Sequence, residues 1–390
     1  MLIISFDAVG DAEFAVLQKY PAFSGLVKKS ALFRNVPSVF VSNTYPVHTS
    51  VATGLKPETH GIIANTEPFP VNNPVWNSRE AGIRAKTLWQ AAAEKGITTA
   101  AVFWPVTAYS KTIRYNIPEV LARPGKSQLL TSLQAGSTLL QLRLFLRYRK
   151  LLDGVRQPNL DNFACACMTD ILKKFNPGLA FIHLTACDFL CHEHGRHHEG
   201  TENPALTKAF ESLDKNLDAL LKAAGDERDI ILFSDHSQIN VHTVVDPNVI
   251  LKFRGLLPSS NDGYIPGEHG CYFECCGGSA FLHKGTLPSE TVENIRTAIE
   301  QSEGFRRFLS PDELLASGYS HAAFGFCAKV GYCYGKPQSG VKANHGYPLD
   351  MPDYSVFYII KGMGIQPGLM DNGSLLDIAP FAAKRMGLNL

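Results

Sequence analysis

The sequence predicts an α/β protein with a mostly parallel central sheet and helices on both of its faces. Three short apolar runs are typical of buried parallel strands, and each is followed by an acid. These runs are Leu2–Phe6 before Asp7, Leu179–Cys187 before Asp188, and Ile230–Ser234 before Asp235. Helical segments precede the second and third runs, at Phe163–Phe175 and Pro204–Ala224. Repeated helix-then-strand units favour a parallel sheet with two covered faces.

The rest of the chain continues this pattern, with one interruption. We expect helices at Ala12–Ser30, Lys86–Lys95, 127–152 and Leu375–Met386, a short apolar stretch at Ala31–Val36, and strands at Thr98–Phe103 and Tyr354–Ile360. The stretch from Val245 to Gly335 does not continue the alternation of helices and strands, because it is rich in Gly, Pro and aromatic residues. We interpret it as a smaller inserted subdomain near the active site. The predicted division is a catalytic core over 1–244, an inserted cap over 245–339 and the end of the core over 340–390.

The composition is that of an ordinary globular protein and excludes several classes of partner. The 390 residues are 45% hydrophobic and 19% charged. The formal net charge is only +1, so the protein as a whole has no long-range electrostatic attraction for nucleic-acid polymers or acidic membranes. No apolar stretch approaches the roughly 18 residues of a membrane span. The basic end of the 127–152 helix is interpreted as solvated. No oligomeric state is specified.

The cysteines and the N-terminus favour a cytoplasmic location. The nine cysteines are an odd number and are scattered without a disulfide framework, which favours a reducing compartment. We interpret the clustered ones as small buried hydrophobic residues rather than a thiolate metal site; they are Cys165, Cys167, Cys271, Cys275 and Cys276. The N-terminus enters strand-like sequence at Leu2 and lacks the features of a secretion signal.

The acids at the ends of the three predicted strands are candidates for a metal site. In open α/β sheets, ligands bind just beyond the carboxyl ends of the strands, so Asp7, Asp188 and Asp235 should meet at one edge. Three histidines follow these acids or precede the last core strand; they are His192, His236 and His345. Carboxylates and histidines are ligands of Zn²⁺, which takes about four per ion. Paired ions about 3.5–4 Å apart hold both the attacking and the leaving oxygen of a phosphoryl displacement.

Thr44 is the best candidate for a nucleophile. It precedes Tyr45, Pro46 and a run suited to a helix. A hydroxyl at a helix N-terminus lies beside unsatisfied backbone N–H groups and the positive end of the helix dipole, and both favour a phosphate. A metal bound to the hydroxyl would favour the alkoxide.

The ordered set of motifs resembles the nucleotide pyrophosphatase/phosphodiesterase family (type I phosphodiesterases) of the alkaline phosphatase superfamily. The motifs are Asp7 after the first strand, the Thr44–Ile62 segment, Asp188-x-x-x-His192, Ser234-Asp235-His236 and Asn344-His345-Gly346-Tyr347. Asp-x-x-x-His alone is a weak signal, whereas the set in this order is specific and covers nearly the whole chain. The resemblance implies an alkaline-phosphatase-like fold. The chain departs from its relatives at Ser237-Gln238, where they often carry Gly-Met, and we expect this to reshape the pocket rim.

The resemblance also implies roles for individual residues. One Zn²⁺ would be bound by Asp7, Thr44, Asp235 and His236, and a second by Asp188, His192 and His345; Mn²⁺ or iron are alternative metals. Thr44 would attack phosphorus and form a phospho-threonine intermediate, which a water on the second ion would hydrolyse. Asn65 matches the family asparagine that donates to a phosphate oxygen. Tyr45 lies where the family stacks an aromatic ring on a nucleobase.

Several of these residues also have a purely structural interpretation. A single acid after a strand is usually a turn or capping residue, and Thr44 alone would more often be a helix cap than a nucleophile. Tyr45 is explained equally well by packing. His183 is interpreted as a core histidine or one that bonds to a ligand side chain. The other histidines near the motifs are interpreted as solvated or as partners of the ligands; they are His48, His60, His194, His197 and His198.

The leading functional hypothesis is a two-zinc hydrolase of phosphodiester or phosphoanhydride bonds, acting on a nucleotide or another small molecule. The alternative is a phosphonate hydrolase of the phosphonoacetate hydrolase type, which uses the same ligands with a threonine. A phosphomonoesterase is less favoured, because that branch favours serine and an arginine that grips the phosphate. A degenerate binding protein would have lost at least one ligand, and every ligand is present.

Overall fold

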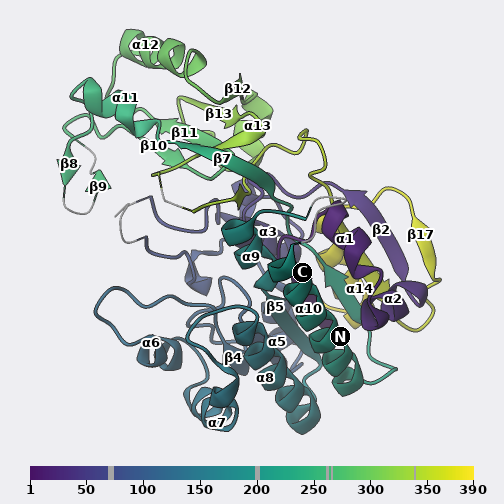
Figure 1. The fold of residues 1–390 in the computed structure, drawn as a ribbon. Helices are drawn as coiled ribbons and strands as arrows, with labels where there is room; N and C mark the ends of the chain where they lie inside the picture. Colours follow the sequence, from purple (N-terminus) through teal and green to yellow (C-terminus); the bar gives the residue numbers. More distant parts are fainter. Residues whose placement is uncertain (69–73, 198–202, 261–262, 265–266, 338–339) are drawn as a thin grey trace.

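A large, mostly parallel sheet forms the centre of the computed structural model, which describes residues 1–390 except 69–73, 198–202, 261–262, 265–266 and 338–339 (Figure 1). Its eight strands lie in the order β17-β2-β16-β6-β1-β5-β3-β4. They are β1 Leu2–Phe6, β2 Ala31–Val36, β3 Thr99–Val102, β4 Tyr115–Ile117, β5 Leu179–Leu184, β6 Ile230–Phe233, β16 Val356–Lys361 and β17 Gly368–Met370. Neighbours are parallel except around β16, which is antiparallel to β2 and β6. The predicted fold class is confirmed.

Helices cover both faces of this sheet. Along β1, Leu2, Ile4 and Phe6 face one apolar core and Ile3 faces the other. The first core is closed by α1 Asp11–Leu17, α2 Pro21–Lys28, α8 Asn159–Phe175, α9 Ala186–His194 and α10 Pro204–Ala224. The second is closed by α3 Thr44–Thr53, α5 Leu88–Glu94 and α14 Ile378–Met386. Because both faces of the strands are buried, their sequences are continuously apolar rather than alternating.

Two long predicted helices are each divided into shorter ones. The helix predicted over Ala12–Ser30 is broken before Pro21, which has no N–H and disfavours a helical conformation at the preceding residue. The helix predicted over 127–152 is divided into α6 Gln128–Ala135, α7 Thr138–Tyr148 and the short η2 Arg149–Leu151. The break lies at Gly136, where a Cβ atom would approach the Asn116 carbonyl oxygen to 2.5 Å.

A smaller set of strands lies above the large sheet in Figure 1. Four antiparallel strands, in the order β10-β11-β13-β12, have an apolar core of their own. They are β10 Tyr272–Cys275, β11 Ser279–His283, β12 Phe305–Phe308 and β13 Phe324–Ala328, accompanied by α11 Asn248–Phe253, α12 Ser289–Glu300 and α13 Pro311–Ala316. The proposed cap boundaries at 245 and 339 stay predictions.

A three-stranded sheet follows directly after the third predicted acid. β7 Ile239–Val245 pairs in parallel with β14 Gly331–Tyr334 and antiparallel with β15 Ala343–Asn344. The pairing of β7 with β15 places the segment around His345 next to the residues that follow Asp235 in the chain. Remaining short elements are α4 Pro57–His60, η1 Glu80–Gly82, β8 Ser259–Ser260, β9 Gly263–Tyr264 and η3 Leu375–Asp377.

The cysteines behave largely as hydrophobic residues. All nine are free thiols, and all are buried except Cys275, which is partly exposed. Among the described residues, none of the groups of side chains that could hold a metal contains a cysteine. In the same part of the chain, no helix has the length and apolar character needed to cross a membrane.

Candidate metal centre

Three neighbouring strands deliver the predicted acids to one edge of the large sheet. β1 lies between β5 and β6 and is parallel to both. Asp7 directly follows β1, and Asp235 lies two residues beyond the end of β6. The prediction that a strand continues up to Asp188 is wrong: β5 ends at Leu184, and Asp188 lies in the first turn of α9.

Asp161 explains why β5 ends early and α9 begins. Its carboxylate accepts hydrogen bonds from the backbone N–H groups of Thr185 and Ala186, each at 2.9 Å. This bonding satisfies donors that a helix N-terminus leaves open. The helix then places Asp188 and His192 four residues apart on one face, and Asp188 Oδ1 lies 3.4 Å from His192 Nε2.

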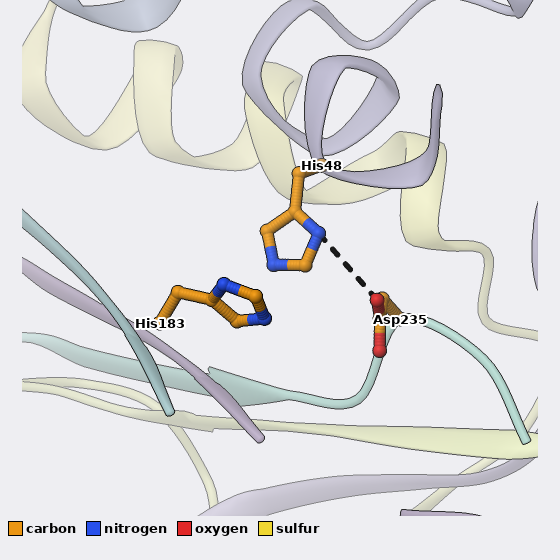
Figure 2. Close-up of side chains that lie close together, drawn as sticks. All are labelled: His48, His183 and Asp235. Carbon is orange, nitrogen blue, oxygen red and sulfur yellow. Dashed lines mark ion pairs between the residues drawn. The ribbon is translucent and has the colours of Figure 1, made fainter. Parts of the chain in front are cut away.

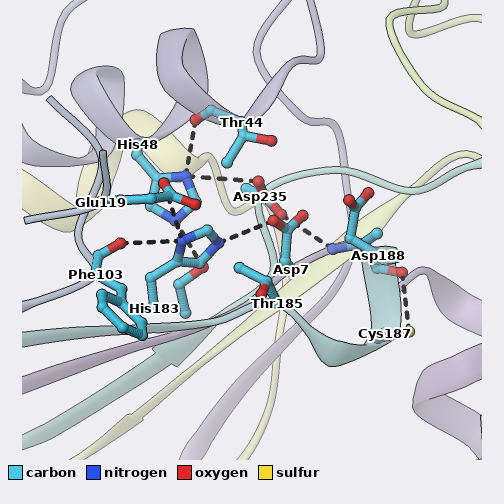
Figure 3. Close-up of polar contacts among 12 residues, drawn as sticks. Asp7, Thr44, His48, Phe103, Glu119, His183, Thr185, Cys187, Asp188 and Asp235 are labelled. Carbon is cyan, nitrogen blue, oxygen red and sulfur yellow. Dashed lines mark hydrogen bonds and ion pairs between the residues drawn. The ribbon is translucent and has the colours of Figure 1, made fainter. Parts of the chain in front are cut away.

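The first group of predicted ligands converges on the Nε2 atom of His236. This atom lies 3.4 Å from Asp7 Oδ1, 3.4 Å from Asp235 Oδ2 and 3.3 Å from Thr44 Oγ1. All four side chains are buried, with Thr44 the most exposed at 7%. Figure 3 shows Thr44, Asp235 and Asp7 close to one another above the sheet. The four residues come from the ends of β1 and β6 and the start of α3.

The second group lies directly beside the first. Asp188 Oδ1 is 3.4 Å from His192 Nε2 and 4.0 Å from His345 Nε2. Ligand atoms of Asp7, Asp188 and His236 all lie within 4.8 Å of one another, so Asp188 adjoins both groups. The rings of His236 and His345 are stacked with centroids 4.1 Å apart. The structure therefore brings the predicted ligands together in two adjoining clusters.

The side chains of this centre fit divalent cations. Asp7 Oδ1 and Asp235 Oδ2 are buried and have no hydrogen-bond partner. Burial and the neighbouring carboxylates of Asp235 and Asp188 raise the pKa of Asp7 well above its usual range. Burial likewise raises the pKa of Asp235 to about 8. Buried acceptors that face one another without a donor are relieved by a bound proton, as the raised pKa values indicate, or by a positive ion between them, and a pair of cations would supply that charge.

Hydrogen bonds hold two of the histidines with Nε2 free to bind a metal. His192 Nδ1 lies 2.7 Å from the Ala343 carbonyl oxygen, and His345 Nδ1 lies 2.8 Å from Asn43 Oδ1. Such bonds at the second ring nitrogen fix the orientation and tautomer of ligand histidines. Burial lowers the pKa of His345 to about 4, so its ring is neutral at physiological pH, as a ligand must be.

Asn65 is oriented by the start of α3. Its side-chain carbonyl accepts a hydrogen bond from the Tyr45 backbone N–H at 2.8 Å. The amide NH₂ of Asn65 is therefore the group available to donate a hydrogen bond into the cavity next to Thr44, since Asn65 lines that cavity. A donor in this place can bind an oxygen of a substrate bound at Thr44. The predicted role of Asn65 is compatible with this geometry.

Tyr45 lies beside Trp76. Tyr45 is only 3% exposed and packs with Ile62 and Val106. Its ring meets Trp76 edge to face, with centroids 5.8 Å apart, and both rings line the cavity that contains Thr44. Stacking of Tyr45 on a nucleobase stays a prediction. Trp76 was not identified from sequence, because a lone tryptophan between loops carries no motif.

His48 and His183 lie beside Asp235 of the first cluster, as Figure 2 shows. His48 is fully buried; its Nε2 bonds with Ser5 Oγ at 2.9 Å and its Nδ1 with the Thr44 carbonyl oxygen at 2.8 Å. His183 Nε2 lies 2.9 Å from Asp7 Oδ2, which agrees with its interpretation as a partner of a ligand. His48 Nδ1 is 3.5 Å from Asp235 Oδ2. These two histidines and Asp235 form a third group with metal-ligand geometry.

Two further residues at the centre were not assigned a role from sequence. Gln238 is buried and donates from Nε2 to Asp188 Oδ1 at 2.5 Å. The expectation that Ser237-Gln238 affects only the pocket rim is therefore wrong for Gln238, which orients a predicted ligand. Glu119 Oε2 lies 3.8 Å from His183 Nδ1, and burial raises the pKa of Glu119 to about 8. Gln238 follows the Ser234-Asp235-His236 motif, whereas Glu119 belongs to no local motif.

The remaining histidines flanking the motifs differ in exposure. His60 is buried and its Nε2 bonds with Ser50 Oγ at 2.9 Å, so it stabilises the loop after α3 rather than the metal centre. The side chain of His194 is 48% exposed and His197 is partly exposed, in agreement with a solvated position. His198 lies outside the described residues.

Two cavities adjoin the centre, and both are lined by Asn65, Thr66 and His345. The larger has a volume of about 990 Å³ and also includes Asp7, Thr44 and Asp188. The smaller has a volume of about 300 Å³ and is lined by polar residues of the upper strands, among them Glu274. A phosphate held at Thr44 would have space on two sides for its substituents.

Comparison with known proteins identifies the family. The sequence pattern of type I phosphodiesterase/nucleotide pyrophosphatase matches residues 1–310. The chain belongs to this family. Human ectonucleotide pyrophosphatase/phosphodiesterase family member 5 is 31% identical over 116 residues, 27% of this chain and 24% of that protein. Human bis(5'-adenosyl)-triphosphatase ENPP4 is 30% identical over 118 residues, 27% of this chain and 25% of that protein. These matches span about a quarter of the relatives' own length.

Solved structures share the fold over the whole chain. Murine ectonucleotide pyrophosphatase/phosphodiesterase 5 superposes with a TM-score of 0.69 at 17% identity, covering 100% of this chain and 95% of that one. Phosphonoacetate hydrolase from Sinorhizobium meliloti 1021, in complex with phosphonoacetate, superposes with a TM-score of 0.66 at 15% identity, covering 98% and 94%. These likenesses agree with the predicted alkaline-phosphatase-like architecture.

Proposed function

We propose that this protein hydrolyses phosphodiester or phosphoanhydride bonds with two divalent cations, preferably zinc, and with Thr44 as the nucleophile. The observation that carries this proposal is the position of Thr44 Oγ1, 3.3 Å from His236 Nε2 and beside the two buried carboxylate oxygens that have no partner. Asp7, Thr44, Asp235 and His236 would hold one ion, and Asp188, His192 and His345 the other. Bound cations would supply charge neutralisation at phosphorus and lower the pKa of oxygen ligands.

The proposed reaction has two steps at phosphorus. In the first, Thr44 loses its hydroxyl proton and Oγ forms a bond to phosphorus, while the bond from phosphorus to the leaving oxygen breaks with its electron pair and the leaving oxygen takes up a proton. In the second, water loses a proton and forms a bond to phosphorus, while the bond to Thr44 Oγ breaks and Oγ takes up a proton. The side chain is then restored and the product is a phosphate with one substituent fewer. Covalent catalysis of this kind divides one difficult displacement into two easier ones.

The first turn of α3 makes Asn65 important for the bound phosphate. Tyr45 N–H donates to Asn65, Pro46 has no N–H, and Val47 N–H donates to the Asn43 carbonyl at 3.1 Å. Backbone donors at this helix end are therefore largely occupied, although the positive end of its dipole remains. The Asn65 amide supplies a donor in their place, aimed at the charge that develops on phosphorus oxygens.

Trapping the covalent intermediate tests the proposal. Zinc-loaded protein is mixed with bis(p-nitrophenyl) phosphate, quenched in acid and examined by peptide mass spectrometry. We expect the mass of the substituted phosphoryl group on the peptide that contains Thr44. Thr44→Ala should abolish turnover and labelling, while Thr44→Ser should retain both at a lower level. Unchanged turnover by Thr44→Ala would contradict the assigned nucleophile.

A phosphonate hydrolase is the second candidate. The specific observation in its favour is the similarity in fold to phosphonoacetate hydrolase over 98% of this chain. A substrate panel of a phosphodiester, a phosphomonoester and phosphonoacetate separates the candidates, because each substrate is assayed by itself and represents one class of reaction. Preferential release of phosphate from phosphonoacetate would favour the second candidate, and preferential cleavage of the diester the first.

A nucleotide is the substrate class suggested by the relatives. One relative is named a bis(5'-adenosyl)-triphosphatase, and an inactive variant of murine ectonucleotide pyrophosphatase/phosphodiesterase 5 has been solved in complex with AMP. The Tyr45 and Trp76 rings beside Thr44 give a nucleobase an aromatic surface to contact. A cytoplasmic location stays a prediction, and the nine free thiols are compatible with it.

A further inference from the structure

We infer that the outer face of α7, formed by Leu139, Leu142 and Leu146, binds the surface of an anionic membrane. This helix lies with α6 at the lower left of Figure 1, at the opposite end of the protein from the smaller set of strands. None of these three described leucines lines either cavity at the metal centre. The inference therefore concerns where the protein binds, and it does not depend on the proposed reaction at Thr44.

The helix α7 is apolar on two sides. Leu140 and Leu144 are buried in the first core. Leu139, Leu142 and Leu146 follow one another at the spacing of residues that share one side of a helix, and they are 83%, 41% and 60% exposed. A helix that is apolar on most of its surface is normally buried on all sides. The exposed leucines therefore mark a surface that binds a partner.

The segment that contains α7 is strongly cationic. From Val120 to Leu152 the sequence has no Asp or Glu and six Lys or Arg residues, which are Arg123, Lys126, Arg143, Arg147, Arg149 and Lys150. Arg143 and Arg147 each directly follow a leucine of the outer face. The whole chain has a net charge of only +1 because its acids lie elsewhere, so the low overall charge does not exclude an acidic partner at this segment.

Most of this positive charge is not neutralised within the protein. Arg143 and Arg147 share one carboxylate, that of Asp170, at 2.5 and 3.0 Å. Among the described residues, no Asp or Glu forms an ion pair with the other four cations, which are exposed; they are Arg123, Lys126, Arg149 and Lys150. Cations beside exposed leucines are typical of helices that lie in a membrane interface. The basic end that the sequence analysis interpreted as solvated would then contact lipid phosphates.

A second copy of this chain fits the outer face of α7 less well than a membrane does. In a two-fold symmetric contact the same surface lies on both sides, so the cations of the two copies would face one another. Like charges that meet across an interface disfavour binding. A membrane with anionic lipids supplies the opposite charge together with an apolar layer for the leucines, so charge complementarity favours it.

Vesicle sedimentation tests the inference. The full chain is mixed with vesicles of phosphatidylcholine alone or with about 30% phosphatidylserine, and the bound fraction is measured against lipid concentration. We expect binding at least tenfold tighter to the vesicles that contain phosphatidylserine. Raising NaCl from about 0.1 M to about 1 M, which shortens the Debye length from about 10 Å to about 3 Å, should weaken this binding at least tenfold. No binding, or equal binding to both kinds of vesicle, would overturn the inference.

Variants at two exposed leucines locate the contact. The double variant Leu139→Ser, Leu146→Ser should weaken binding to the phosphatidylserine vesicles at least tenfold, because burial of one leucine contributes about tenfold or more in affinity. The matched control is Leu315→Ser, Leu369→Ser, since these leucines are 53% and 68% exposed but lie on α13 and β17. It should leave binding unchanged, and thermal unfolding of each variant checks that the fold is intact. Equal effects of the two double variants would contradict the location.

Reversal of two lysine charges tests the electrostatic part. Each Lys near an anionic leaflet contributes about fivefold in affinity, so Lys126→Glu, Lys150→Glu should weaken binding about 25-fold or more at low salt. Lys284→Glu, Lys329→Glu is the control, because both lysines are exposed in the smaller set of strands and the change in net charge is the same. It should weaken binding much less. Equal losses would show attraction by the whole chain and would contradict a site at α7.

Two further measurements identify a different partner for the same face. Sedimentation velocity without lipid tests for a second copy, and a dimer that Leu139→Ser, Leu146→Ser dissociates would overturn the membrane as the partner. Titration with polyglutamate tests for an acidic polypeptide; binding as tight as to the vesicles, and unaffected by the leucine variant, would overturn it as well. None of these measurements depends on turnover, so failure of the proposed function does not change their interpretation.

Discussion

Substitutions at Asn65 test transition-state stabilisation at this centre, and Asn65→Ala combines a catalytic and a structural effect. The substitution removes the amide donor next to Thr44 and also the acceptor of the Tyr45 N–H bond of 2.8 Å. Loss of one donor to a developing negative charge lowers kcat by about 10²–10³, or about 2.7–4 kcal/mol. Loss of the acceptor leaves a buried N–H without a partner, which destabilises the fold by about 1–3 kcal/mol.

Asn65→Asp separates the two effects. The carboxylate still accepts from Tyr45 N–H, so the free energy of unfolding should stay closer to that of the unmodified protein than in Asn65→Ala. It has no donor and carries a charge that repels phosphate, so kcat/KM should fall at least as far. Asn77→Ala is the control, because Asn77 Nδ2 donates to the Ala64 carbonyl at 2.9 Å in the same loop region. It should affect stability more than activity.

The assay for this series is hydrolysis of bis(p-nitrophenyl) phosphate at saturating zinc, with thermal unfolding of each variant in parallel. The reasoning is refuted if Asn65→Asp keeps kcat within threefold of the unmodified protein. It is also refuted if Asn77→Ala lowers kcat as much as Asn65→Ala, because the loss would then reflect the loop and not the donor.

The remaining predictions concern the metal ligands and pH. Gln238→Ala should weaken binding of one ion about 10–100-fold, the usual effect of removing a partner of a ligand. Zinc titration monitored by calorimetry checks this, and affinities at both sites equal to those of the unmodified protein would contradict it. In metal-free protein, burial raises the pKa of Asp235 to about 8, so the folded state keeps a proton that the unfolded state loses. Stability should therefore fall as pH rises from about 4 to about 8, and thermal unfolding with and without zinc should show a stabilisation by zinc that grows over this range. The pKa of His345, lowered to about 4 by burial, has the opposite sign: the unfolded state binds a proton first, so its contribution to stability is lost as pH falls from about 6.5 towards 4. Activity should fall as the pH approaches about 4, where the ligand His345 becomes protonated in the folded protein, and a pH–rate profile that stays flat below about pH 4 would contradict this.

The sequence predicted the sheet and the placement of its acids because both depend on local patterns. Continuous apolar runs identified β1 and β6, and the rule that ligands lie beyond the carboxyl ends of parallel strands placed Asp7 and Asp235 together. Asp188 was placed at the correct edge of the sheet but in the wrong element. The start of α9 depends on two hydrogen bonds that Asp161 accepts from backbone N–H groups 24 and 25 positions further along the chain, and the sequence pattern does not show them.

Contacts between distant residues account for what the sequence did not predict. His48 lies four residues after Thr44 on α3, so the helical spacing was a usable signal, but its bond to Ser5 depends on the packing of α3 on β1. Glu119, and the bond from Gln238 to Asp188, reach the centre only through the folded chain. The leucines of the 127–152 segment do not all pack in the core, because Leu139 is 83% exposed and Leu133 lines a cavity. An apolar pattern does not distinguish a core from the wall of a cavity.

Anomalous X-ray diffraction at the zinc edge, from crystals grown with zinc, tests the central claim most directly. We predict two peaks about 3.5–4 Å apart, one bound by Asp7, Thr44, Asp235 and His236 and the other by Asp188, His192 and His345. A single peak within the group of His48, His183 and Asp235, which also has metal-ligand geometry, would contradict the account. So would full zinc occupancy in crystals without any ion in contact with Thr44.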